Sequence, residues 1–151
     1  MLKMINVLFL SALLATGLSA AAELGTADEA IAMVDKATAY LAKNGRDKTL
    51  VEINKPNGAF VDRDLYVVVH DMTGKVLANP VLPRMVGKDI KDIKDVDGKA
   101  FVRERLAKLE KSEKGWIDFK WPNSLTQKID VRSAYFVRVG DLVFTCGIVK
   151  K

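Results

Sequence analysis

The 151-residue chain is poor in histidine and cysteine, two residue types that often bind metals or act in catalysis. His70 is the only histidine and Cys146 the only cysteine, so no cluster of side chains has the spacing of zinc ligands. The acidic run at Asp95 and Asp97 has part of a calcium-loop spacing, but Ile93 stands where the first ligand carboxylate is required. No nucleophile and base are marked by their spacing. We therefore expect no catalytic site, no metal and no cofactor.

One cation and four aromatic residues favour a binding site instead. Arg132 lies just inside an otherwise apolar segment, where a charge needs solvent or a partner, and a guanidinium suits a small carboxylate. The aromatic residues lie in or near expected strands and offer apolar walls with a polar tip: Tyr66, Trp116, Trp121 and Tyr135. A surface salt bridge for Arg132 and core packing for the aromatic residues are the alternatives.

A hairpin is expected to carry part of this site. Leu65 to His70 is rich in β-branched residues, Asp71 to Gly74 supplies a turn, and Val76 to Ala78 forms the returning strand. Prolines follow Asn79 and cannot donate to a β-ladder, so the sheet gives way to a loop there. Loops held by a rigid scaffold are common places for binding groups.

The alternation of side chains along a strand predicts which hairpin residues face a ligand. Tyr66 and His70 have the same parity and should share one face, whereas Leu65, Val67 and Val69 should face a helix on the other. His70 then either lines a pocket or has a satisfied structural role.

The first 22 residues have the pattern of a secretory signal peptide. A charge at Lys3 precedes an apolar run from Ile5 to Leu14, and small residues lead to a cleavage point after Ala21 or Ala22. Residues 23–151 should then form a single exported domain, in the periplasm or secreted. The net charge is +5, but acidic and basic residues are interspersed, which does not favour nucleic-acid binding.

Three segments have helical patterns. Thr26 and Glu29 form a capping box, which predicts a helix that continues to Asn44. A second, short helix is expected over Thr49 to Ile53, and a third over Lys99 to about Glu113.

Between these helices, Lys88 to Val96 repeats the triplet KDI, KDI, KDV. Helical or 3₁₀ turns would bring Ile90, Ile93 and Val96 near one face and leave the charged residues in water. Asp97 should cap the helix that follows.

Three consecutive strands are expected at Trp116–Trp121, Ile129–Val139 and Leu142–Val149. Alternation along the second places Arg132 and Tyr135 on opposite faces, so both can serve one pocket only if a β-bulge intervenes. Helices, a hairpin and three consecutive strands indicate an α+β domain with an antiparallel sheet. Cys146, inside an apolar run, is expected to be a buried small hydrophobe.

Seven motifs occur in an order that resembles a known family. They are Asn54 to Phe60, Leu65 to Val69, Leu77 to Pro80, Gly87 to Asp89, Asp97 to Lys99, Gly115 to Phe119 and Tyr135 to Val137. With these motifs in this order, residues 23–151 resemble the single Cache domain of the second type over nearly their whole length. The resemblance implies a PAS-like antiparallel sheet of about five strands, with a long N-terminal helix across one face and a small-ligand pocket on the other.

Members of that family sense small molecules outside the cytoplasm, often short carboxylates, usually as the outer part of chemoreceptors and kinases. The resemblance thus implies a sensor-type binding module for a short organic acid, not an enzyme. Arg132 and Tyr135 should grip its carboxylate, although the family often carries Lys where Arg132 stands. The remaining expected ligand-binding residues are Tyr66, His70, Asn79, Trp116 and Trp121.

A second interpretation is an accessory protein with a vestigial pocket, which presents a sheet edge or its long helix to a membrane-bound sensor. The sequence indicates no nucleic-acid partner and leaves both a monomer and a homodimer open.

Overall fold

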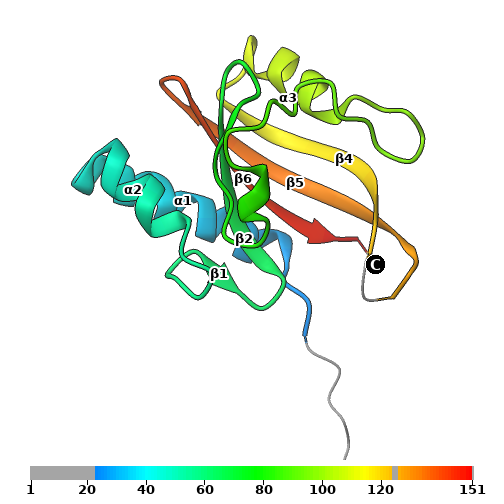
Figure 1. The fold of residues 1–151 in the computed structure, drawn as a ribbon, viewed down its shortest axis with the longest axis horizontal. Helices are drawn as coiled ribbons and strands as arrows, with labels where there is room; N and C mark the ends of the chain where they lie inside the picture. Colours follow the sequence, from blue (N-terminus) through cyan, green and yellow to red (C-terminus); the bar gives the residue numbers. More distant parts are fainter. Residues whose placement is uncertain (1–22, 124–125, 151) are drawn as a thin grey trace, which may run out of the picture.

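An antiparallel sheet with helices on both faces forms the centre of the computed structural model, which describes residues 23–123 and 126–150 (Figure 1). Along the sheet the strands follow the order β1-β2-β6-β5-β4, and β3 pairs with β2. The strands are β1 (Val61–Asp62), β2 (Leu65–Asp71), β3 (Val76–Ala78), β4 (Lys114–Pro122), β5 (Ile129–Val139) and β6 (Leu142–Val149). The predicted α+β class is confirmed.

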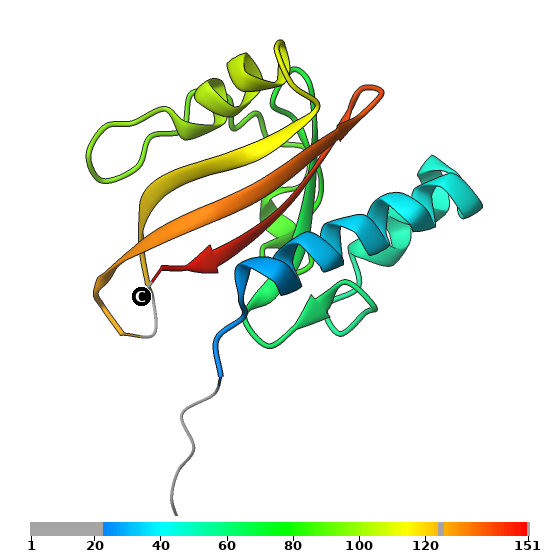
Figure 2. The same ribbon diagram turned by 180° about the vertical axis from the view of Figure 1, so that it is seen from behind.

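The helices lie on different sides of the sheet. Helix α1 (Ala27–Asn44) crosses one face and is followed by α2 (Arg46–Ile53), whereas α3 (Phe101–Leu109) covers part of the other face (Figure 2). A 3₁₀ turn, η1 (Pro83–Met85), lies in the loop after the hairpin. Among the described residues, no helix is long and apolar enough to cross a membrane. The predicted signal peptide, residues 1–22, lies outside the described residues.

The start of α1 is the capping box that the sequence predicts. The backbone N–H of Glu29 donates to the hydroxyl of Thr26 (3.3 Å), and the Glu29 carboxylate accepts from the backbone N–H of Thr26 (2.8 Å). Each bond satisfies a donor that the first helical turn leaves unpaired. Gly45 ends the helix with a positive φ of 80°, and α2 begins at Arg46, three residues before the expected Thr49.

The predicted hairpin is also present. The Asp71 carboxylate accepts from the backbone N–H of Thr73 (2.8 Å) and of Lys75 (3.0 Å), which fixes the turn between β2 and β3. Strand β2 also pairs with β6 over Val67 to Asp71, so this hairpin is anchored in the middle of the sheet.

Only part of the segment from Lys88 to Val96 forms the helical or 3₁₀ turns that the sequence predicts. The backbone of residues 87–90 pairs instead with the hairpin: Val76 N–H donates to Lys88 O (2.9 Å) and Ile90 N–H to Gly74 O (2.9 Å). These bonds hold residues 88–90 extended, because their backbone groups find partners on the hairpin. Turns follow, in which Ile93 N–H donates to Ile90 O (3.1 Å) and Gly98 N–H to Asp95 O (3.0 Å). Ile90 and Ile93 face the sheet, but Val96 is 47% exposed, so the three do not share one buried face.

Helix α3 is shorter than predicted and has a different start. It runs from Phe101 to Leu109, and no side chain caps its N-terminus. The expected cap at Asp97 is therefore wrong. Asp95 organises this loop instead, because its carboxylate accepts from the backbone N–H groups of Asp97, Lys99 and Lys120.

Alternation along the strands divides the buried residues into two groups. On the α1 face, the sheet packs Leu65, Val67, Val69, Phe144 and Cys146 against the helix, all at 0% exposure. Burial raises the pKa of Cys146 to about 12, so the thiol stays protonated, as expected of a small hydrophobe. On the α3 face, a second apolar cluster leaves a cavity.

Candidate functional site

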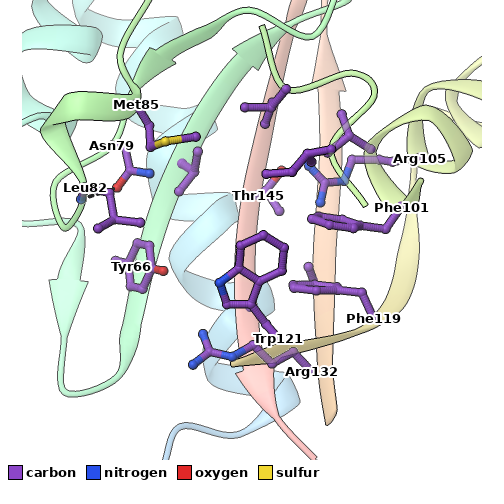
Figure 3. Close-up of a pocket in the computed structure, with 16 residues that line it drawn as sticks. Tyr66, Asn79, Leu82, Met85, Phe101, Arg105, Phe119, Trp121, Arg132 and Thr145 are labelled. Atoms are coloured by element: carbon purple, nitrogen blue, oxygen red, sulfur yellow. Dashed lines mark hydrogen bonds between the residues drawn. The ribbon is translucent and has the colours of Figure 1, made fainter. Parts of the chain in front are cut away.

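The cavity lies between the α3 face of the sheet and the loops after the hairpin, and has a volume of about 170 Å³ (Figure 3). Its lining contains two arginines and no acidic residue. The lining residues are Tyr66, Val68, Asn79, Leu82, Met85, Ile90, Ile93, Phe101, Val102, Arg105, Phe119, Trp121, Arg132, Ala134, Thr145 and Gly147.

An aromatic wall closes one side of the cavity. The rings of Phe101 on α3 and Phe119 on β4 stack with centroids 4.3 Å apart, and Trp121 meets Phe101 edge to face at 5.8 Å. Because β4 alternates as predicted, Ile117, Phe119 and Trp121 all lie on this face. These rings offer an apolar surface to the body of a ligand.

Arg105 is a buried cation at one end of the cavity. Its side chain projects from α3 and the residue is 4% exposed. One guanidinium nitrogen lies 2.9 Å from Nε2 of His70, and the group lies 5.9 Å from the centroid of the Phe136 ring. No ion pair joins it to a carboxylate of the described residues. Burial lowers the pKa of Arg105 to about 10, so the group remains charged at neutral pH.

His70 is the hydrogen-bond acceptor for the Arg105 guanidinium. Nδ1 lies 2.8 Å from the carbonyl oxygen of Asp71, which requires a proton on Nδ1 and leaves Nε2 as the acceptor for Arg105. Burial, together with the adjacent Arg105 charge, lowers the pKa of His70 to about 4, so the ring is neutral at pH 7. His70 is fully buried and is not among the cavity-lining residues; it contacts the site through Arg105.

Arg132 lies at the other end of the cavity, and its charge is only partly compensated. Its guanidinium is 3.4 Å from the Asp130 carboxylate, which also accepts from the side-chain amide of Asn123 at 2.8 Å. Tyr66 lies next to Arg132; burial raises the pKa of the Tyr66 phenol, and the Arg132 charge opposes that shift.

Three buried polar atoms without a hydrogen-bond partner all belong to residues that line this cavity. Among the described residues, Nε of Arg105, Nε of Arg132 and the hydroxyl of Thr145 have this property. Buried donors are normally paired, so these three atoms are available to a ligand or to water that fills the cavity.

Asn79 organises the loop that bounds the cavity. Its side-chain oxygen accepts from the backbone N–H groups of Val81 (3.1 Å) and Leu82 (2.8 Å), and its own backbone N–H donates to the side chain of Asn54 (2.9 Å). The amide nitrogen of Asn79 is directed toward the cavity in Figure 3.

A second hollow of about 630 Å³ adjoins the first. The two share Tyr66, Leu82, Trp121, Arg132 and Gly147 as lining residues. Arg132 therefore lies where the inner cavity meets this wider hollow. Arg105 lines the inner cavity but not the wider hollow.

The family comparison agrees with this architecture. A sequence model described as single Cache domain 2 matches residues 22–141. The chain belongs to this family. Cache domains are sensory ligand-binding modules, and the cavity of this Cache domain lies on the sheet face opposite the long helix, where the resemblance implies a pocket.

A curated relative of this Cache domain is the methyl-accepting chemotaxis protein McpP of Pseudomonas putida. The two are 26% identical over 74 residues, which make up 49% of this chain and 14% of the receptor. The chain thus matches only a small part of that relative's length.

Three solved structures share this fold. One is the periplasmic sensor domain of a chemotaxis protein (17% identity, TM-score 0.62, 82% of this chain and 90% of that chain). Another concerns carboxylic acid recognition by a Cache chemosensory domain (20%, 0.63, 82% and 88%). The third is a methyl-accepting chemotaxis protein from Vibrio parahaemolyticus (21%, 0.66, 81% and 86%).

The Cache domain brings together only some of the residues expected to bind a ligand. Tyr66, Asn79, Trp121 and Arg132 line the cavity. The predicted parity of β2 also holds, because Tyr66 faces the cavity while Leu65, Val67 and Val69 pack on the α1 side.

Trp116 and Tyr135 lie on the other face of the sheet. Their rings contact each other at 5.2 Å between centroids and pack with the α1 cluster. The register of β5 with β4 and β6 is continuous, so no bulge turns Tyr135 to the side of Arg132. These two residues are separated from the cavity by the sheet itself.

Arg105, Phe101, Phe119 and Thr145 line the cavity of the Cache domain but were not predicted as ligand-binding residues. A signal for Arg105 was present in the sequence. It follows Val102 by three residues and precedes Leu109 by four, which places a charge on the apolar face of the predicted helix.

No group of three or more His, Cys, Asp or Glu side chains that could hold a metal ion occurs in the described part of the chain.

Proposed function

We propose that this chain is a periplasmic sensor-type module that binds a small organic acid, with the acid's carboxylate held by Arg105. The observation that carries the proposal is the buried, charged guanidinium of Arg105, which lines an apolar cavity, lacks a carboxylate partner and has an unpaired Nε.

A buried charge is costly unless it is paired. Removing a cation from water costs several kcal/mol, and a neutral histidine compensates only part of that cost. An anionic ligand would supply the missing counter-charge and accept from the free Nε. Charge-assisted hydrogen bonds of guanidinium to carboxylate are short and strong, so binding should concentrate at this group.

The size of the cavity restricts the ligand. A cavity of about 170 Å³ is close to the roughly 150 Å³ that holds a benzene molecule in an engineered apolar site. A short organic acid matches this space, with its body against Phe101, Phe119 and Trp121.

The other cavity residues have roles that follow from their positions. Tyr66 and Asn79 bound the cavity from the hairpin side, and the hydroxyl of Thr145 offers one more unpaired group. His70 acts indirectly: as a neutral acceptor it orients Arg105 without competing for the acid. Trp116 and Tyr135 are left out of this proposal because they pack on the α1 face.

The periplasmic location rests on the signal-peptide pattern of residues 1–22. It is supported by the neighbour titled as a periplasmic sensor domain. The acid class is supported by the neighbour whose title names carboxylic acid recognition.

Titration calorimetry with acetate, propionate, pyruvate and butyrate tests the proposal. We expect at least one of these acids to bind the wild type, and Arg105→Met to weaken that binding by about 10- to 100-fold, the value of a lost charged hydrogen bond. Arg103→Met is the matched control, since Arg103 lies on the same helix but is exposed and pairs with Asp92; it should change affinity by less than about twofold. Equal binding of an acid by Arg105→Met and by the wild type would contradict the proposal. Failure of the wild type to bind any of these acids or their dicarboxylate counterparts would also contradict it.

A further inference from the structure

The two cavity arginines lie at opposite ends of the apolar wall. Figure 3 shows Arg105 at one end and Arg132 at the other, with Phe101 and Phe119 between them. Both have a buried, unpaired Nε, and no acidic residue lines the cavity. The cavity is thus cationic at both ends and apolar in the middle.

The register of β5 gives the scale of this separation. Arg132, Ala134 and Phe136 lie on the cavity face of the strand, and Arg105 packs over the Phe136 ring. Phe136 is four residues beyond Arg132, which corresponds to about 13 Å along a strand. The Arg132 guanidinium is not directed toward Arg105 in Figure 3, so one small acid of the size of acetate cannot contact both guanidinium groups.

The environment of Arg132 is that of a second anion-binding group rather than a completed salt bridge. Its contact with Asp130 is 3.4 Å long and involves one nitrogen, and Asp130 is already bonded to Asn123. The Arg132 side chain is 27% exposed and lies where the inner cavity meets the wider hollow. A group bound there would keep some contact with water, which suits the second carboxylate of a dianion better than an apolar end.

We propose that the preferred ligand of this cavity is a linear dicarboxylate of about four to six carbon atoms, with one carboxylate on Arg105 and the other on Arg132. This inference rests on the proposed function and specifies its ligand class. The methylene chain lies along Phe101, Phe119 and Trp121, where a polar middle would lose hydration without a partner.

Pairs of acids of equal chain length test this inference by titration calorimetry: succinate against butyrate, glutarate against pentanoate, and adipate against hexanoate. We expect the best diacid to bind the wild type at least about tenfold more tightly than its matched monoacid, since it gains a second charge-assisted contact. Arg132→Gln should reduce that preference to less than about threefold by weakening the diacid alone.

Arg138→Gln is the matched control. Arg138 lies on the same strand but bonds the carbonyl oxygen of Gly140 and does not line the cavity. This variant should retain the wild-type preference for the diacid.

The outcomes separate the inference from the proposed function. If every monoacid binds as tightly as its diacid, or the preference survives in Arg132→Gln, the dicarboxylate inference is overturned. In that case, monoacid binding that depends on Arg105 would still support the proposed function. If no acid of either series binds, both are overturned.

Discussion

The two faces of one sheet differ in how their buried groups are satisfied. On the α1 face, Val67 and Phe144 are fully buried in a closed apolar core. On the α3 face, neighbours in the same strands, Tyr66 and Thr145, border a cavity. The unpaired buried polar atoms of the described residues all lie on the cavity side. Because side chains alternate along a strand, one face of the sheet can form a closed core while the other leaves polar groups available to a ligand.

The largest expected effect comes from the α1 face. Phe144→Ala should lower the free energy of unfolding by about 3–5 kcal/mol, because it removes a large side chain from a site with 0% exposure. Phe119→Ala, on the partly exposed aromatic wall, should cost only about 1–2 kcal/mol, since the cavity already leaves one side of that ring without protein contacts. Urea unfolding of both variants measures the difference. Equal losses would remove the contrast between the faces.

The next largest effect is the pH dependence of the unfolding free energy that is due to the buried, neutral His70. Its pKa is about 4 in the folded protein, below the ordinary 6.5, so the unfolded chain binds more protons between these values. The stability from neutral His70 is therefore present above pH 6.5 and lost as the pH falls toward 4, by about 3 kcal/mol.

The variant His70→Gln separates the pH dependence of stability that is due to His70 from that due to Asp and Glu carboxylates. His70→Gln keeps an acceptor for Arg105 but does not titrate, so the difference in unfolding free energy between wild type and variant should change by about 3 kcal/mol from pH 7 to pH 4. A pH-independent difference would mean that His70 is not held neutral against Arg105.

The smallest effect compares two hydroxyl groups on opposite faces. Ser133 donates to the Asp118 carboxylate at 2.5 Å, so Ser133→Ala should cost about 1 kcal/mol of unfolding free energy. The Thr145 hydroxyl has no partner, so Thr145→Val should change stability by less than about 0.5 kcal/mol. Thermal unfolding of both variants checks this. A larger loss for Thr145→Val would show that its hydroxyl is satisfied in solution.

Local patterns in the sequence predicted much of the fold. The capping box at Thr26 and the hairpin turn at Asp71 involve partners only a few residues away, so their hydrogen bonds can be inferred from spacing. The prediction of helical or 3₁₀ turns over Lys88 to Val96 was wrong for residues 88–90, because their backbone bonds run to the hairpin, a partner that the triplet repeat does not reveal. The predicted start of α3 was wrong for a similar reason: the Asp95 carboxylate accepts from the backbone N–H of Lys120 on β4, a partner distant in the sequence.

The candidate site was only partly predictable. Alternation correctly assigned Tyr66 to the face opposite Val67, and it correctly separated Arg132 from Tyr135 unless a bulge intervened. It could not show which face of β4 and β5 would be closed by α1, so Trp116 and Tyr135 were grouped with the pocket. Arg105 was missed because burial of a charge depends on what packs around the helix.

The unfolding of Arg105→Met, with and without excess propionate, tests the central claim that the buried charge is kept for an acid. Without propionate the stability of the variant should lie within about 2 kcal/mol of the wild type, because removal of a buried charge without a counter-charge offsets the cost of leaving Nε2 of His70 unpaired. Propionate should stabilise the wild type and stabilise the variant much less, since the variant binds the acid more weakly. A variant that is destabilised by more than about 2 kcal/mol without propionate, or stabilised by it as strongly as the wild type, would contradict the claim.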